Sequence, residues 1–331
     1  MRRIQLPEPP CPTSRSGTPD IFESGVHTFV RRAIVIGNGF AASENQSVGL
    51  VRALGLSDKH VLYEKKLVPL PSENGVGAGL LAVLEADVKE IVSFARETYE
   101  KEGPLLVVAC GRDTISTASS IKRLASENAF VVQIQNPRLH LNRFDMVITP
   151  KHDYYPLTPE GQKQVPWFLR SWITPRDPPD CHVLAASLLS VLASCGSVRI
   201  SFSERTPQKV SNIIVKELGS NPKVYIWDGQ GHNRHMGHLA WADAFVVTAD
   251  SVSMISEACS TGKPVYVLGA EHCKWKFTEF HKSLREQGVV RPFTGSEDIS
   301  ESWSYPPLTD TADAAKKVHE ALAARGWKLK V

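Results

Sequence analysis

The segment with the clearest chemical potential begins where an apolar run, 244–248, meets a pattern typical of a helix. Ser251 and Ser253 stand in the first turn of that helix, and Glu257 lies one to two turns further on. Free backbone amides and hydroxyl groups at a helix N-terminus bind anions such as phosphate. A carboxylate placed as Glu257 is can accept hydrogen bonds from ribose hydroxyl groups. The three residues predict a nucleotide site; a well-capped helix with an exposed glutamate is the alternative.

A second candidate site follows the apolar run 33–36. Residues 37–42 read Gly-Asn-Gly-Phe-Ala-Ala and match G-x-G-x-x-A, in which glycines let the backbone approach a pyrophosphate at a helix start. Gly37, Asn38 and Gly39 are therefore candidate ligand-binding residues. A plain tight turn between strand and helix and a different ligand at the same strand end are the alternatives.

The surroundings of this glycine pattern match a dinucleotide site only in part. Ser43 and Gln46 form a capping-box pattern, which predicts that the helix begins at Ser43 and ends at Gly55. Glu64 follows the next strand candidate, 60–63, in the place of the acidic residue that binds a ribose.

Two further patterns suggest ligands. Arg112 follows the apolar run 105–109, where it could hold an anion at the end of a strand. The spacing His232-x-x-His235-x-x-His238 suggests a metal, but steps of three residues spread imidazoles around a helix rather than bringing them together. We predict no metal site, no cofactor and no catalytic residue.

Composition excludes several classes of protein. The 331 residues carry a formal charge of only +3 and 42% hydrophobic residues, which fits a buried core and not a dedicated nucleic-acid binder. The six cysteines form no CxxC pair, so we expect a reduced protein without a zinc ribbon. Five prolines in the first twenty residues predict a disordered tail over 1–28.

Apolar runs and amphipathic stretches alternate on both sides of a proline-rich segment, which predicts an α/β fold of two doubly wound Rossmann-like domains. We expect a first domain at 29–150, a linker at 151–182 and a second domain with a C-terminal helix at 183–331. Expected strands are 33–36, 60–63, 105–109, 130–135, 146–149, 198–202, 223–227, 244–248 and 265–268. Expected helices are 43–55, 81–101, 114–128, 183–195, 206–218, 250–261, 275–287 and 312–325.

Long stretches of the chain resemble the plant mitochondrial fission proteins of the Elongated-mitochondria type. The likeness covers nearly the whole chain and lies in RRAIVIGNGF, SENQSVGLVRALGLSDKH, GPLLVVACGRDTISTASSIKRLASEN, NRFDMVITPKHDYYPLTPEGQ, NPKVYIWDGQ, HMGHLAWADAFVVTADSVSMISEACSTGKPVYVLGAEHCKW and ESWSYPPL. The resemblance implies a two-domain fold like that of the GT-B glycosyltransferases. Glu257 would match the ribose-binding glutamate of those enzymes, and Ser251 and Ser253 would match the start of their phosphate-facing helix.

The resemblance also implies a function. Such a protein would be peripheral to the cytosolic face of the mitochondrial outer membrane, and also cytosolic, and would help to recruit a dynamin-related GTPase. An adaptor on a glycosyltransferase-like scaffold, without turnover, is the first hypothesis. A nucleotide-sugar-dependent glycosyltransferase is the second, and an NAD-linked oxidoreductase is the third.

The chain departs from the family pattern at two places, and both resemble internal deletions. One follows Tyr63, where the family continues through a long basic segment. The other follows Pro179, where the family has a strand and a glycine-bearing loop ahead of the helix that begins here at Val183. Because the first strand of a doubly wound sheet is central, we predict that the C-terminal sheet is incomplete.

Overall fold

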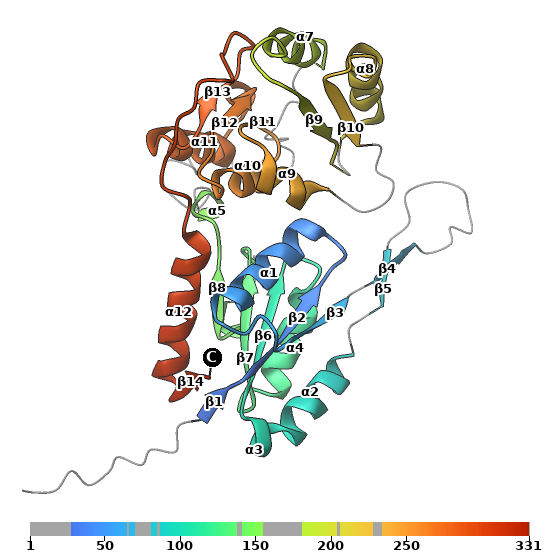
Figure 1. The fold of residues 1–331 in the computed structure, drawn as a ribbon. Coiled ribbons are helices and arrows are strands. Elements are labelled where there is room, and N and C mark those ends of the chain that lie inside the picture. Colours follow the sequence, from blue (N-terminus) through green and yellow to red (C-terminus); the bar gives the residue numbers. More distant parts are fainter. Residues whose placement is uncertain are drawn as a thin grey trace, which may run out of the picture.

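The chain is described by a computed structural model, drawn in Figure 1. It describes residues 28–64, 66–69, 81–84, 87–137, 141–154, 181–203, 206–227 and 234–330. The expected tail before residue 28 and most of the expected linker lie outside these residues. Two α/β domains are present, as the alternating pattern predicts.

The first domain is built on a parallel sheet of five strands in the order β3-β2-β6-β7-β8. Continuous apolar runs form its central strands, which are buried on both faces as parallel sheets require. All five of its strands were expected: β2 Arg32–Gly37, β3 His60–Glu64, β6 Leu105–Cys110, β7 Ala129–Ile134 and β8 Met146–Ile148.

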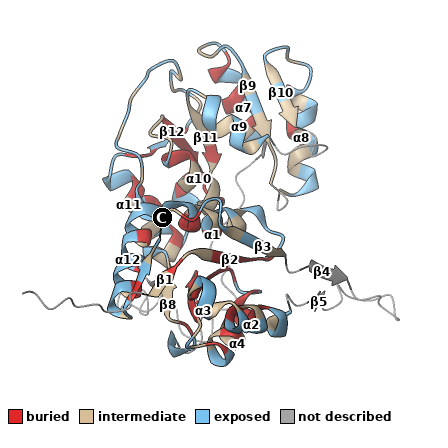
Figure 2. Cartoon of the chain, turned by 60° about the horizontal axis from the view of Figure 1, so that its bottom comes forward, coloured by how far each residue is buried: buried red, intermediate tan, exposed pale blue. Residues whose placement is uncertain are grey.

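Helices cover both faces of this sheet (Figures 1 and 2). On one face α1, Ala41–Ala53, packs beside α12, Asp310–Ala324, and both contribute to one apolar cluster with the sheet. On the other face α2, Val88–Glu97, and α4, Ile115–Leu124, form a second cluster. A short helix, α3, Tyr99–Glu102, follows α2.

Two expected helix starts were wrong. Residues Leu81–Leu84 form strand β5, which pairs antiparallel with β4, Lys66–Pro69, and α2 begins only at Val88. The Asp87 carboxylate accepts hydrogen bonds from the amides of Lys89 and Glu90, and this cap sets the start of α2.

The helix expected from Ser43 begins at Ala41 instead. Ser43 is therefore inside α1 rather than its cap. The acidic residue in the first turn is Glu44, where a negative charge is favourable.

The second domain holds two short parallel sheets. Strands β9, Val198–Ser201, and β10, Val224–Trp227, form one of them, and the other has the order β11-β12-β13. The strands of the latter are β11 Phe245–Thr248, β12 Val265–Leu268 and β13 Arg291–Pro292. The helices of this domain are α7 Cys181–Val191, α8 Gln208–Leu218, α9 His235–Trp241, α10 Val252–Cys259 and α11 Lys276–Glu286.

The two sheets share one apolar layer with the helices that cover them. Ile200 of β9, Val246 of β11 and Leu268 of β12 all pack in one apolar cluster with α7 and α8. Among the described residues, no strand pairs with β9 and β11 from between them. The incomplete C-terminal sheet stays a prediction, because the residues directly before α7 lie outside the described ones.

The two domains are held together by the last helix and by a contact near the linker. β14, Trp327–Leu329, follows α12 and pairs in parallel with β1, Thr28–Val30, so both ends of the described chain meet on the first domain. In the second contact, α5, Lys151–Tyr154, lies against α11, and Asp153 accepts a 2.5 Å hydrogen bond from Lys276. The expected C-terminal helix therefore belongs to the core of the first domain.

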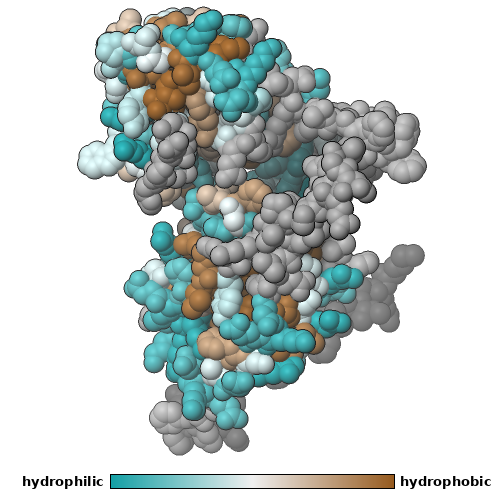
Figure 3. Space-filling model, turned by 90° about the vertical axis from the view of Figure 1, so that its right-hand side faces the viewer, coloured by the Kyte–Doolittle hydropathy of each residue, from teal (hydrophilic) through white to brown (hydrophobic). Residues whose placement is uncertain are grey.

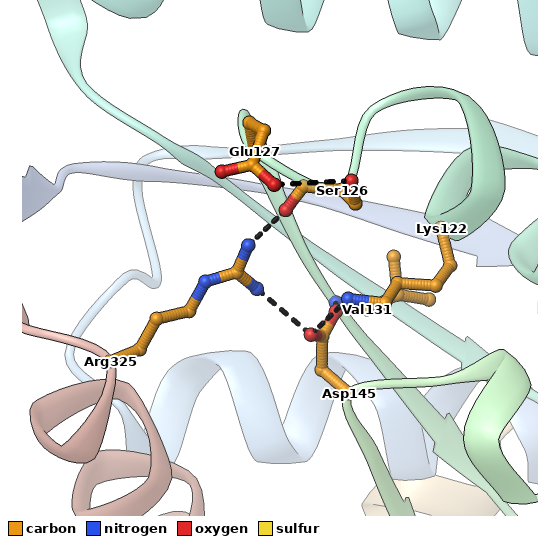
Figure 4. A network of polar contacts seen from close by, with 6 residues as sticks. All are labelled: Lys122, Ser126, Glu127, Val131, Asp145 and Arg325. Carbon is orange, nitrogen blue, oxygen red and sulfur yellow. Dashed lines mark hydrogen bonds and ion pairs between the residues drawn. The ribbon is translucent and has the colours of Figure 1, made fainter.

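Asp145 is the centre of the polar contacts that fasten α12 (Figure 4). Its carboxylate accepts from Lys122 Nζ at 2.5 Å, from Arg325 Nη1 at 2.8 Å and from the Val131 amide at 2.8 Å. The other guanidinium nitrogen of Arg325 donates to the Ser126 carbonyl. Asp145 is 9% exposed, so its charge is stabilised by these donors more than by water.

We expect Asp145→Ala to lower the free energy of unfolding by about 2–4 kcal/mol, because it leaves two cations and a buried amide without their acceptor. Urea unfolding measures the change. Glu320→Ala removes an exposed ion pair on the same helix, α12, and should leave the midpoint unchanged. Equal effects of the two substitutions would show that the Asp145 cluster does not fasten α12.

Cys110, Cys195 and Cys259 form no disulfide bond, and burial raises the pKa of all three thiols, which lowers their reactivity. Burial raises the pKa of the Cys110 and Cys259 thiols to about 12. At pH 8 iodoacetamide should therefore alkylate Cys195, which is half-buried, before either of them. Mass spectrometry of the native and the unfolded chain shows the order in which the cysteines are alkylated. Modification of Cys110 before Cys195 would contradict the burial of the Cys110 thiol.

Candidate functional site

The glycine turn after β2 satisfies its own hydrogen bonds. The Gly39 amide donates to the Glu44 carboxylate at 2.8 Å, and the Phe40 amide donates to the Asn38 side chain at 3.2 Å. Asn38 is buried and Gly39 is exposed with a φ of +78°, a conformation that glycine adopts without strain. The amides of Gly39 and Phe40, two of those that would hold a pyrophosphate here, already have acceptors within the chain.

Glu44 also fills the space beside Gly37. A Cβ atom on Gly37 would lie 2.5 Å from Glu44 Oε1, so the carboxylate rests directly against the glycine backbone. A negative side chain in this position opposes a phosphate through like charge. The structure thus favours the tight-turn alternative for Gly37, Asn38 and Gly39 over dinucleotide binding.

The loop that carries Arg112 lies next to this turn. A Cβ atom on Gly111 would approach the Asn38 side chain to 3.0 Å, so the loops after β2 and β6 meet at the carboxyl end of the sheet. Arg112 is exposed at this edge. Gln133, which no sequence pattern singled out, is fully buried behind the loops and donates to the carbonyl oxygens of Gly111 and Ile134.

The second candidate site lies at the start of α10. Ser251 is the residue that precedes the helix, but its side chain caps no backbone amide. The hydroxyl group is buried, in a residue that is 5% exposed, and it has no hydrogen-bond partner. Ser253 is half-buried and is the second residue of the helix. An uncapped helix start beside an unpaired hydroxyl can receive an anion.

Glu257, further along α10, is already paired. Its carboxylate lies 2.7 Å from His235 Nε2, at the first residue of α9. A ribose would have to compete with this imidazole for the carboxylate. Both α9 and α10 lie on the side of the second domain that faces α1 (Figure 1). The structure therefore places Ser251 directly before α10, and Ser253 and Glu257 within it. Glu257 contacts His235, a partner that the sequence did not indicate.

The histidine pattern does not form a metal site among the described residues. His238 Nδ1 lies 3.1 Å from the Ser201 hydroxyl, whereas His235 contacts Glu257, and His232 lies outside the described residues. Burial, with the neighbouring charges of Arg199 and His235 and Arg234, lowers the pKa of His238. His238 is thus neutral at pH 7.

A hollow of about 10 Å³, which is room for about one water molecule, lies elsewhere, between β12, β13 and α11. Its walls include His281, Arg285 and Arg291. None of the candidate residues lines it, so it adds nothing to either candidate site.

Together these features define a two-domain α/β protein with a fold of the GT-B type. A putative UDP-N-acetylglucosamine 2-epimerase from Listeria monocytogenes has a similar fold, with a TM-score of 0.52 and 12% identity over 89% of this chain and 96% of that one. At this identity the likeness concerns the fold alone.

The sequence comparisons define the family. Residues 41–175 and 171–322 match the family model described as mitochondrial fission ELM1, and the chain belongs to this family. The mitochondrial fission protein ELM1 of Arabidopsis thaliana is 55% identical in an alignment of 428 positions that takes in all of both chains. An uncharacterized protein of Rickettsia prowazekii is 29% identical over 69% of this chain and 81% of its own length.

The alignment bears on the expected deletions. Because it has 428 positions and this chain has 331 residues, the Arabidopsis protein has residues at many positions where this chain has none. The two matched segments of the family model also meet at residues 171–175, close to Pro179. Residues are therefore missing from this chain relative to that protein. That they are missing after Tyr63 and after Pro179 stays a prediction.

We expect Gly39→Val to lower the free energy of unfolding by about 1–3 kcal/mol. The cause is the positive φ and not crowding, since a Cβ atom here would meet no neighbour within 4 Å. Thermal unfolding tests this. Gly39→Asn is the matched control, because asparagine tolerates this conformation, and it should cost less than the valine. A valine variant as stable as the asparagine variant would contradict the explanation.

Proposed function

We propose that this protein is a mitochondrial fission factor that acts as an adaptor and helps to localise a dynamin-related GTPase to the mitochondrial outer membrane. Membership of the mitochondrial fission ELM1 family carries the proposal. On this proposal the chain works at the cytosolic face of that membrane and also exists free in the cytosol. No described helix is long and apolar enough to cross a membrane.

Three features of the candidate sites support an adaptor without turnover. Glu44 occupies the glycine turn where a phosphate would bind, and His235 occupies the carboxylate of Glu257. The central place of the second sheet, against which a nucleotide would rest in a doubly wound domain, holds no described strand. Each of these three features weakens a ligand site.

The surface of the second domain supports an interaction role. Apolar residues gather on this domain on the side where α8 lies (Figure 3). Helices α7 and α8 leave Val183, Leu189 and Val215 about half exposed. Exposed apolar groups of this kind are typical of surfaces that meet another protein or a membrane.

The experiment is complementation in Arabidopsis thaliana cells that lack the fission relative. We expect this chain to restore mitochondrial length, and Glu257→Ala to restore it equally, since an adaptor needs no ribose contact. Asp145→Ala, which weakens the attachment of α12, is the control for a damaged scaffold and should restore it less. Failure of the unmodified chain would contradict the fission role.

The same cells test the adaptor step. The fraction of the dynamin-related GTPase that co-localises with mitochondria should rise when the chain is expressed. If mitochondrial length recovers while this fraction stays constant, the fission role stands and the recruitment of the GTPase is wrong.

A nucleotide-sugar-dependent enzyme is the alternative, and the unpaired hydroxyl of Ser251 at the uncapped start of α10 favours it. Titration calorimetry with UDP distinguishes the two. We expect no binding of UDP at concentrations up to about 1 mM, which is on the order of the weakest dissociation constants that matter for a metabolite. Tight binding that is lost in Ser251→Ala and Glu257→Ala, together with loss of complementation in Glu257→Ala, would favour the enzyme.

A further inference from the structure

Helix α9 turns its polar side chains inward and its apolar side chains outward. His235 contacts Glu257 and His238 contacts Ser201, so both imidazoles face the body of the second domain. The exposed residues of the helix are all uncharged: Met236, Gly237, Ala240 and Trp241. Their spacing places them on a single stripe of the helix surface. A surface helix normally has the opposite polarity, with its charged residues in the solvent.

The exposure of this stripe is high as well as apolar. Trp241 is 86% exposed, the highest value among the large apolar residues that the structure describes, and Met236 is 63% exposed. Lys263 donates to the carbonyl oxygens of Ala240 and Ala242, which holds the end of the helix in place. A single exposed apolar side chain needs no explanation, but an apolar stripe around an exposed tryptophan is typical of a binding surface.

Two exposed arginines border the same helix. Arg234 directly precedes α9, and its guanidinium lies 5.7 Å from the centre of the Tyr225 ring, while that of Arg199 lies 5.4 Å from the same centre. Burial lowers the pKa of His238, and the charges of Arg199, His235 and Arg234 lower it further, so positive charge gathers at this end of α9. The helix dipole does not favour a cation ahead of the first turn, so helix stability does not account for Arg234.

These residues together are called the α9 surface: Arg199, Tyr225, Arg234, Met236, Gly237, Ala240 and Trp241. Their composition favours a protein partner, because Trp, Tyr, Met and Arg are enriched in protein interfaces and Lys is depleted there. Guanidinium groups also bind carboxylates in a paired, planar geometry. A segment that binds a membrane by charge carries about four to eight Lys or Arg, more than this surface has.

We propose that the α9 surface is the docking site for an acidic segment of the protein that this adaptor recruits. Apolar side chains of the segment lie on Met236 and Trp241, and its carboxylates pair with Arg199 and Arg234. Asp243 is exposed beyond the other end of α9, so the acidic end of the segment lies at the arginines. The inference rests on the proposed adaptor function and assigns the surface that performs it.

The complementing Arabidopsis thaliana cells test the surface, because the location of the chain and that of the dynamin-related GTPase are separate readouts. Trp241→Ala should leave the chain on mitochondria but lower the co-localised fraction of the GTPase at least about fivefold, as truncation of a central interface residue does. Trp241→Phe keeps an aromatic ring and should lower it less. Leu141→Ala removes an exposed apolar side chain from the first domain and is the matched control.

The arginines test the acidic character of the segment. Replacing Arg199 and Arg234 together by glutamine should lower the same fraction at least about fivefold, whereas replacing both by lysine keeps the charge and should restore part of it. Arg123→Gln, at an exposed position of α4, is the matched control. The thermal unfolding midpoint of every purified variant should equal that of the unmodified chain, because these side chains are exposed.

Four results would overturn the proposal. If Trp241→Ala restores both mitochondrial length and the GTPase fraction fully, the α9 surface is not the docking site, although the fission role stands. Loss in Val215→Ala but not in Trp241→Ala would place the docking site on α8. If the Trp241→Ala chain leaves the mitochondria and also sediments less with vesicles of phosphatidylcholine and phosphatidylinositol, the surface binds lipid. Failure of the unmodified chain to restore mitochondrial length would contradict the fission role, and this inference with it.

Discussion

A central strand of a parallel sheet is stable only when a neighbour satisfies its backbone groups on each edge, and this requirement separates the two domains. In the first domain β2, β6 and β7 are flanked on both sides, and nearly all their residues are buried. In the second domain β9 and β11 have one described neighbour each, and most of their residues are only half-buried. The central strands of the first sheet are therefore paired on both edges, whereas among the described residues β9 and β11 are each paired on one edge.

The consequences for function follow from where ligands bind in such folds, at the carboxyl ends of the central strands. In the first domain this place is occupied from within the chain, because Glu44 accepts the hydrogen bond of Gly39. In the second domain the start of α10 keeps an unpaired hydroxyl on Ser251, but Glu257 is held by His235. Candidate sites that are engaged from within the chain are consistent with the adaptor proposed above.

Much of the fold could be predicted from the sequence because its signals are local. Continuous apolar runs such as 105–109 and 265–268 predicted buried strands, and β6 and β12 are buried strands. The start of α2 could not be placed, because the amphipathic pattern of the helix continues through residues 81–84, which pair with β4 instead.

The interactions that decide the candidate sites are less visible in the sequence. Arg325 and Asp145 are 180 positions apart, so no local pattern joins α12 to the first domain. His235 and Glu257 lie on different helices, and Glu44 meets Gly39 from the first turn of α1. The candidate residues could therefore be named in advance, but their partners could not.

Native-state hydrogen exchange of the free chain at increasing urea concentration tests the central claim most directly, because it reports the opening free energy of each strand separately. The account predicts that β2, β6 and β7 open only with global unfolding of the first domain. It predicts that β9, β10 and β11 open at a clearly lower free energy, by local loss of the open sheet. Equal opening free energies for the strands of both domains would contradict it.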